Sequence, residues 1–151
     1  MAYLNAEFAR SVMDGIEDEF SRSSLYVRLV PVYVAAGAGV ELELDALELR
    51  EAFPRFQLLT ALSREYALQS ALADARRPLD SLRADEAVFA QAGESLLFRV
   101  LQQYVALFLI EDALALLAHI ESPFLRARAF TAIGSARGAG GEFYSGPIVV
   151  P

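Results

Sequence analysis

Apolar residues recur along most of the chain at the spacing of an α-helix. The first stripe, within residues 3–17, consists of Leu4, Phe8, Val12 and Ile16. Wider stripes of the same period predict helices over residues 41–52, 54–74, 94–108, 111–120 and 123–137. The pattern therefore predicts an all-α protein in which about seven or eight helices follow one another.

One segment, residues 20–36, allows two interpretations. It is rich in β-branched and aromatic side chains, which favour a strand. Pro31 argues against a central strand and also against a straight helix. Because Tyr26 aligns with Phe130 of a clearer helix, we predict a helix that is kinked or broken near Pro31 and ends in the Ala/Gly run 35–39.

A break in the chain is predicted at Pro78, which cannot donate a backbone hydrogen bond inside a helix. Asp80 or Ser81 would then cap a new helix. Gly93 would end that helix, because glycine is the usual residue after a helix C-terminus.

The turn between two helices occurs in several copies. Four residues of the first copy return 104 positions later (120 − 16), where Ile120, Glu121, Phe124 and Arg126 correspond to Ile16, Glu17, Phe20 and Arg22. Such self-similarity indicates an array of helix pairs. The Glu and the Arg of each copy could pair across the turn, or the Arg could bond the free carbonyls of the first helix. The predicted pairs are Glu17 with Arg22, Glu51 with Arg55, Glu94 with Arg99 and Glu121 with Arg126.

Residues 113–129 contain an Ala-rich helix, a tight turn with Pro123 and the start of a new helix. This succession resembles the tetratricopeptide-like α-solenoid families, with degenerate repeats that lack the standard signature residues. The resemblance covers residues 3–137 and implies antiparallel helix pairs and a non-enzymatic protein-interaction scaffold. We accordingly expect a helical-repeat domain over residues 1–137, followed by a Gly-rich hinge and an apolar C-terminal tail over residues 138–151.

Composition and charge narrow the range of functions. The 151 residues suffice for one domain with a sizeable core. The chain has no Cys, and its thirteen basic residues are all Arg, which excludes disulfides, Schiff-base chemistry and a P-loop lysine. A net charge of −7 disfavours nucleic acid and anionic membrane surfaces as partners. With no secretory signal and no apolar run of about 20 residues, we expect a cytoplasmic protein.

We find no catalytic constellation, and we expect no metal and no cofactor. The acidic cluster of Asp14, Glu17, Asp18 and Glu19 lacks the loop of an EF-hand, so we interpret it as a solvated surface. His119, the one histidine, has no metal-binding partner near it in sequence.

A protein or peptide partner, a helix or an extended segment, is the expected ligand. Tyr33 and Tyr66 each follow a turn arginine, Arg22 and Arg55, by eleven residues (33 − 22 and 66 − 55). Equivalent positions in a solenoid face the same surface, so these tyrosines could line one concave side. The candidate partner-binding residues are Tyr33, Tyr66, Tyr104, Arg28 and Arg64.

Two alternatives belong to other functional classes. One is a small-molecule sensor or regulatory domain with an apolar pocket between helices, lined by Tyr66, Tyr104 and Phe108. The other is a homo-oligomer in which the tail, residues 144–151, packs on the open solenoid end of a neighbour.

Overall fold

The computed structural model describes residues 2–142 and, within them, the side chains of residues 7–91 and 93–138. The described residues form eight α-helices and no strand, which confirms the predicted all-α class. The helices are α1 (Ala2–Met13), α2 (Glu19–Ala35), α3 (Gly39–Glu48), α4 (Ala52–Leu68), α5 (Leu72–Arg83), α6 (Glu86–Ala106), α7 (Ile110–Leu117) and α8 (Pro123–Glu142).

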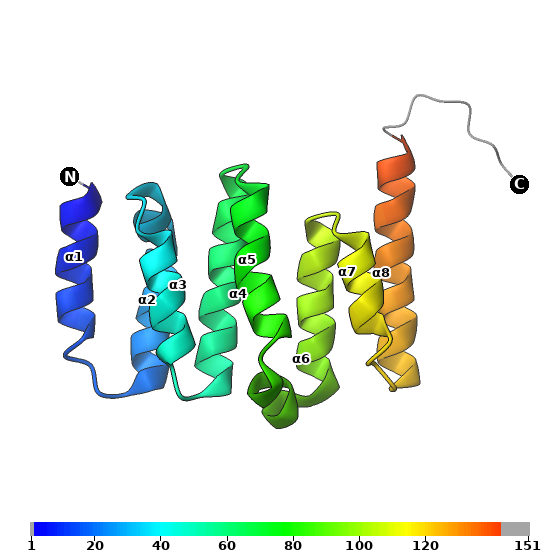
Figure 1. The fold of residues 1–151 in the computed structure, drawn as a ribbon, viewed down its shortest axis with the longest axis horizontal. Helices are drawn as coiled ribbons and strands as arrows, with labels where there is room; N and C mark the ends of the chain where they lie inside the picture. The colour runs from blue at the N-terminus through cyan, green and yellow to red at the C-terminus, as the bar shows by residue number, and fades with distance from the viewer. Residues whose placement is uncertain (1, 143–151) are drawn as a thin grey trace, which may run out of the picture.

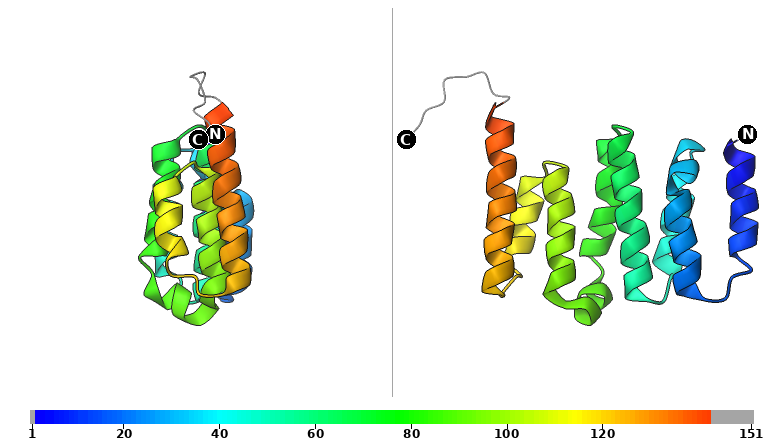
Figure 2. Two further views of the ribbon diagram at one scale, coloured as in Figure 1. Left: turned by 90° about the vertical axis from the view of Figure 1, so that its right-hand side faces the viewer. Right: turned by 180° about the vertical axis from the view of Figure 1, so that it is seen from behind.

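Consecutive helices run in opposite directions and stack into an elongated array with α1 and α8 at opposite poles (Figure 1). The array has two layers, seen edge-on in Figure 2. We call α2, α4, α6 and α8 the even layer and α3, α5 and α7 the odd layer. Within the even layer each helix packs directly on the next, so the even layer forms the continuous spine of the solenoid.

The same turn ends the first three helices of the even layer. One residue in each turn has a left-handed backbone: Gly37 (φ 75°), Ser70 (φ 60°) and Phe108 (φ 58°). The next residue donates its N–H to the carbonyl of a tyrosine: Ala38 to Tyr33 (2.8 Å), Ala71 to Tyr66 (2.8 Å) and Leu109 to Tyr104 (2.9 Å). This is the Schellman arrangement that satisfies the last carbonyls of a helix. Each of these repeats therefore has a tyrosine five residues before the residue that ends the turn.

Phe108 is an unusual occupant of such a turn, because a side chain at positive φ crowds the following carbonyl. Gly37 holds the equivalent position without that cost. Since Phe108 is 62% exposed, we expect Phe108→Gly to raise the free energy of unfolding by about 1 kcal/mol. Urea denaturation would measure the change. The reverse logic predicts that Gly37→Ala lowers stability, and a loss of stability in Phe108→Gly would contradict this account.

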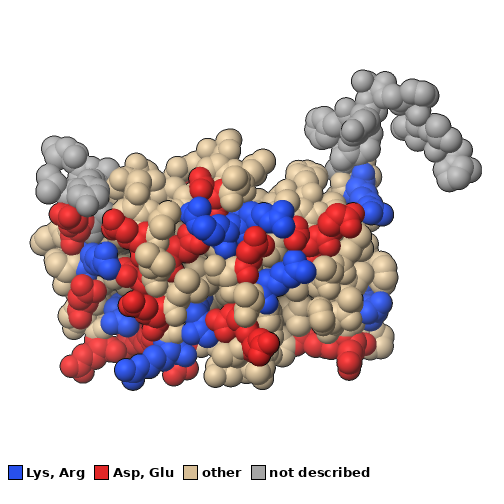
Figure 3. Space-filling view, in the orientation of Figure 1, with Lys and Arg blue, Asp and Glu red and all other residues tan. Residues whose placement is uncertain are grey.

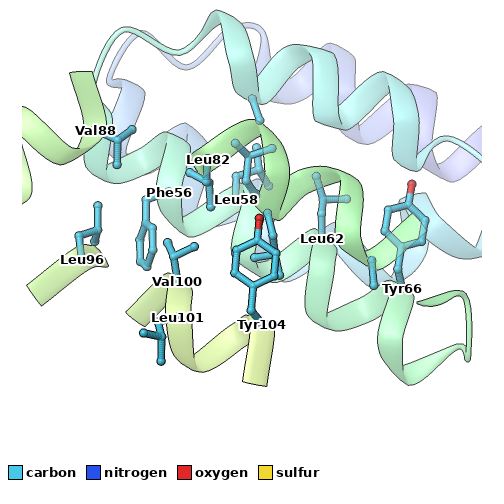
Figure 4. Close-up of a cluster of buried hydrophobic side chains, with 14 of the residues drawn as sticks. Phe56, Leu58, Leu62, Tyr66, Leu82, Val88, Leu96, Val100, Leu101 and Tyr104 are labelled. Carbon is cyan, nitrogen blue, oxygen red and sulfur yellow. The ribbon is translucent and has the colours of Figure 1, made fainter. Parts of the chain in front are cut away.

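The core lies between the layers and consists mainly of leucine, with aromatic rings from the even layer (Figure 4). Tyr104 is fully buried, and its hydroxyl donates to Asp80 Oδ1 of α5 at 2.7 Å. Tyr66 packs against the start of α3, where a Cβ on Gly39 would overlap the tyrosine hydroxyl oxygen. The tyrosines thus tie each helix of the even layer to the odd layer.

Three of the predicted helix boundaries are wrong. The helix predicted over residues 54–74 ends at Leu68, because the turn at Ser70 separates α4 from α5. Pro78 does not break the chain, because it lies inside α5 and is buried. No helix begins at Asp80 or Ser81; instead Asp85 caps α6, and its carboxylate accepts from the N–H of Val88 at 3.2 Å. Burial of three apolar residues of α5 at helical spacing outweighs the one backbone hydrogen bond that proline cannot make. These residues are Ala75, Leu79 and Leu82.

Other boundary predictions are confirmed or refined. Residues 19–35 form the single helix α2, so the segment is not a strand, and the helix is not broken at Pro31, which lies inside it. The predicted interruption at Gly93 is present, since its backbone (φ 68°, ψ −166°) divides α6 into two helical segments. The last helix continues beyond 137 to Glu142, so residues 138–142 are helical where a hinge was expected. The rest of the predicted tail, residues 143–151, lies outside the described residues.

Ion pairs connect α1 and the helices of the odd layer. Arg10 of α1 pairs with Asp45 of α3 at 2.7 Å. Glu43 of α3, which is 4% exposed, pairs with Arg77 of α5 at 3.0 Å. Asp112 of α7 receives two arginines of α5, Arg76 at 3.1 Å and Arg83 at 2.9 Å. Figure 3 shows the result, a face on which acidic and basic side chains alternate.

The predicted Glu–Arg pairs across the turns are wrong, because none of them forms among the described residues. Glutamates of an earlier helix hold the turns instead: Glu19 accepts from the N–H of Arg50 (2.6 Å), and Glu94 accepts from the N–H of Glu121 (2.7 Å). The alternative role of the turn arginine is confirmed for two of the four, Arg55 and Arg126. Arg55 donates to the carbonyl of Leu49 (2.6 Å), and Arg126 to those of Leu117 (3.2 Å) and Ile120 (3.0 Å).

Candidate functional site: an arginine face on the even layer

The arginines differ in their partners. Arg10, Arg55 of α4 and all three arginines of α5 pair with carboxylates. A second group is exposed on the even layer and makes no ion pair with any described residue. Its members are Arg28 of α2, Arg64 of α4, Arg99 of α6 and Arg128 of α8. We call these four residues the arginine face.

The tyrosine position shows that these arginines lie on one side of the layer. Arg99 precedes Tyr104 by five residues, and Arg28 precedes its tyrosine by the same interval. Arg64 precedes Tyr66 by two residues. Positions three residues apart on a helix are neighbours on its surface, so all three project from the same stripe of their helices. That stripe lies opposite the side chains that enter the core.

Aromatic rings hold two of the guanidinium groups in place. The Arg99 guanidinium lies 5.3 Å from the ring centroid of Phe56, which belongs to the neighbouring helix α4. The Arg128 guanidinium lies 5.0 Å from the ring of Phe98 and 5.7 Å from that of Phe124. Cation–π contact fixes a guanidinium without neutralising it. Both side chains are therefore positioned across helix boundaries while their charge stays available.

Two shallow grooves run between the helices that carry these arginines. The groove between α4 and α6 has a volume of about 200 Å³ and is lined by Phe56, Thr60, Arg64, Arg99, Gln102 and Gln103. The groove between α6 and α8 has about 340 Å³. Both combine Arg, Gln and Thr donors with aromatic side chains, of which Phe124 in the second groove is exposed. Such linings suit an extended chain that brings carboxylates and backbone carbonyls.

The charge of the whole chain hides this local basic character. α3 has four acidic residues and no basic one, whereas α8 has Arg126, Arg128 and Arg137 before its terminal Glu142. The net charge of −7 thus results from acidic residues elsewhere, and the even layer presents an unpaired row of arginines. Net charge is a poor guide to a solenoid whose two layers differ.

The structure separates the predicted partner-binding residues into two classes. Arg28 and Arg64 are exposed and belong to the arginine face. Tyr33, Tyr66 and Tyr104 are only 2%, 8% and 0% exposed, so the expectation that tyrosines line an open concave surface is wrong. Their positions are equivalent, as predicted, but the side they share faces the core. Burial raises the pKa of Tyr33 to about 12 and also raises the pKa of Tyr66.

The lining predicted for a small-molecule pocket is not assembled either. Tyr66 and Tyr104 lie in the core, and Phe108 projects from the turn between α6 and α7. A different cavity of about 390 Å³ opens beside α6 and α7, and its apolar lining comes from Phe89, Leu97 and Leu116.

Asp14, Glu17 and Glu19 of the acidic cluster line a cavity of about 610 Å³ formed by the turn after α1, the first half of α2 and the end of α3. In the part of the chain that the structure describes, no three His, Asp or Glu side chains are grouped so that they could hold a metal ion. No helix within the same residues is both long and apolar enough to cross a membrane. Among the described features, the arginine face is the strongest candidate for a functional site.

Comparison with protein-family models gives no match. Comparisons with curated proteins and with solved structures give no match either. The functional argument therefore rests on the geometry of this chain.

Proposed function

We propose that the protein is a non-enzymatic interaction scaffold of the tetratricopeptide-like type whose arginine face binds an extended acidic peptide. The observation that supports this proposal is the difference between paired and unpaired arginines. Arginines of α1 and α5, and Arg55 of α4, pair with carboxylates within the fold, whereas the four arginines of the arginine face make no ion pair with any described residue. Unpaired arginines stacked on aromatic rings are ready to bind carboxylates from outside.

The grooves provide two kinds of contact for such a peptide. Arg64 and Arg99 line the same groove and can each make charge-assisted hydrogen bonds to a carboxylate. Gln102 and Gln103 line it as well, and their amides can donate to and accept from the peptide backbone. An extended peptide presents both groups along its length, whereas a small anion would engage only the arginines. A chain that crosses α4, α6 and α8 would meet both grooves.

The test uses a fluorescein-labelled peptide of alternating Glu and small residues, with binding followed by fluorescence anisotropy. We expect Arg99→Gln to weaken binding about tenfold, since a charged hydrogen bond contributes about 1.5–3 kcal/mol before solvent exposure reduces it. Arg64→Gln should act in the same direction. Arg50→Gln is the matched control, because Arg50 is exposed at the turn between α3 and α4 and should not affect binding.

Two results would contradict the proposal. One is equal affinity of the wild type and Arg99→Gln. The other is equal weakening by Arg50→Gln, which would indicate general charge attraction and not a site. A labelled single-stranded oligonucleotide of the same charge serves as a second probe, and preferential binding of that probe would point to a different class of partner.

A further inference from the structure

The two helices at the poles of the array each lack a partner. α1 runs in the same direction as the odd-layer helices, and α8 runs in the same direction as the even-layer helices (Figure 1). The complete pairs are α2 with α3, α4 with α5 and α6 with α7. Each pair consists of an even-layer helix followed by an odd-layer helix. Within residues 2–142, α1 therefore has no even-layer helix before it, and α8 has no odd-layer helix after it.

α8 exposes an apolar residue at a position that is buried in α2 and α4. Phe130 aligns with Tyr26 of α2 and Leu59 of α4, which are 4% and 0% exposed. In α8 the same position is 55% exposed. The residue is apolar as the repeat requires, but no described helix covers it.

The surface of α1 also has an exposed apolar residue at a position that is buried elsewhere in the array. The offset of 104 residues places Met13 opposite Leu117 of α7, and both are buried, at 2% and 5% exposed. The preceding residue of α7, Leu116, is 3% exposed, whereas its counterpart Val12 is 54% exposed. α1 therefore buries Met13 as α7 buries Leu117, but it leaves Val12 exposed where α7 buries Leu116.

The contact between α6 and α7 shows how these two exposed residues would pack on each other. Leu97 of α6 and Leu116 of α7 line one cavity at the contact between these helices. Leu97 holds the repeat position of Phe130, seven residues before the tyrosine position, and Leu116 holds that of Val12. A contact between Phe130 of one copy and Val12 of the next would reproduce this contact.

Charge at the two poles is complementary. The first nineteen residues contain five acidic residues and one arginine, and Glu7 and Asp14 are exposed around the α1 surface. Residues 123–138 contain Arg126, Arg128 and Arg137 and no acidic residue. Opposite potentials on two surfaces favour their association and set its orientation.

We propose that α8 of one copy packs on α1 of a second copy, so that the protein assembles head to tail and each junction completes a helix pair. The contact uses different surfaces on the two molecules, so it is heterologous and leaves both ends of the product free to bind further copies. This inference goes beyond the proposed binding of a peptide, because it concerns contacts between copies of the chain at the two poles of the solenoid.

The test uses full-length variants that each block one pole. Val12→Asp leaves α8 intact, and Phe130→Asp leaves α1 intact. Both residues are more than half exposed, so circular dichroism should show unchanged folding. By sedimentation velocity we expect the wild type to grow in mass with concentration, each variant to remain a monomer, and an equimolar mixture to form a dimer and nothing larger.

Leu68→Asp is the matched control, since Leu68 is 74% exposed at the end of α4, away from both poles, and should assemble as the wild type does. The proposal is overturned if the wild type stays monomeric, if the mixture of variants stays monomeric, or if Leu68→Asp also abolishes assembly. It is likewise overturned if Phe130→Asp alone still dimerises, because α1 would then contact α1.

Discussion

Gly39→Ala is expected to lower the free energy of unfolding by about 2–3 kcal/mol, at the upper end for overpacking of a tight site. A Cβ at this position would overlap the hydroxyl oxygen of Tyr66 and lie 2.8 Å from its Cζ atom. The ring cannot turn away freely, because Tyr66 is 8% exposed and the Arg77 guanidinium lies 5.7 Å from the ring centroid. Either α3 moves away from α4 or the tyrosine leaves its pocket.

Urea denaturation of two further variants would establish the cause. Gly134→Ala is the matched control, since a Cβ there meets nothing within 4 Å and alanine is the better helix former, so stability should rise by up to about 1 kcal/mol. In a Tyr66→Leu background the clash is gone, and the added cost of Gly39→Ala should largely disappear. Equal costs of Gly39→Ala in both backgrounds would contradict the steric explanation.

The same contact illustrates which parts of the fold are visible in the sequence. Helical periodicity predicts the number and order of helices, including α2, because buried positions recur at helical spacing even among β-branched residues. The order of helices along the chain then implies antiparallel pairs. Gly39, by contrast, looks like one member of an Ala/Gly run that ends a helix. Its role depends on a ring 27 residues away (66 − 39), and no local pattern records that distance.

Proline was the main source of error in the boundaries. A rule for isolated helices places a break at Pro78, but α5 continues through it, since Pro78 is itself buried and packs with the apolar side of the helix. Tertiary burial outweighs local propensity at this position. The capping residue Asp85 could have been found from sequence, because an Asp three residues before Val88 fits an N-cap as well as Asp80 does.

Two of the four residues of the arginine face, Arg28 and Arg64, could be predicted from the sequence. Arg28 and Arg64 could be selected as exposed residues on helices, but their significance depends on which arginines are neutralised inside the fold. Arg77 finds Glu43 across 34 residues, and that pairing requires the layers to be in place. The tyrosines carried the strongest repeat signal, and the sequence placed them at equivalent positions. The sequence could not show that this shared side faces the core. A repeat pattern shows which positions are equivalent, but not whether they point to the core or to solvent.

Those buried tyrosines lead to the second large effect, a steep loss of stability in alkaline solution. Burial is the first cause that raises the pKa of Tyr26, Tyr33, Tyr66 and Tyr104, and for Tyr33 it raises the pKa to about 12. In the unfolded chain each phenol ionises near pH 10. The folded pKa is the higher one, so the stabilising contribution is complete below pH 10 and is lost as the pH rises from 10 towards 12.

The expected slope is large because the four groups act together. Each group whose proton is kept in the folded state and lost in the unfolded state contributes up to about 1.4 kcal/mol per pH unit. Tyr33, with a pKa of about 12, and Tyr104 are the main contributors, and Tyr26 and Tyr66 add to the slope in the same direction. The chain has no Lys and no Cys, which are the other side chains that titrate in this range. The fall in stability between pH 10 and 11.5 therefore reports on tyrosine alone.

Urea denaturation at a series of alkaline pH values would measure the slope, and ultraviolet absorption of tyrosinate would show ionisation coinciding with unfolding. Tyr3 and Tyr144 have no described side chains, so the experiment is best done in a Tyr3→Phe/Tyr144→Phe background. Adding Tyr104→Phe should lower the slope by up to about 1.4 kcal/mol per pH unit, since the other three groups are unchanged. At neutral pH the same change should cost about 1 kcal/mol for the lost hydrogen bond to Asp80. A flat stability profile from pH 9 to 11.5 would show that the phenols reach solvent in the folded protein. The tyrosines would then not be the buried ties between layers on which the repeat depends.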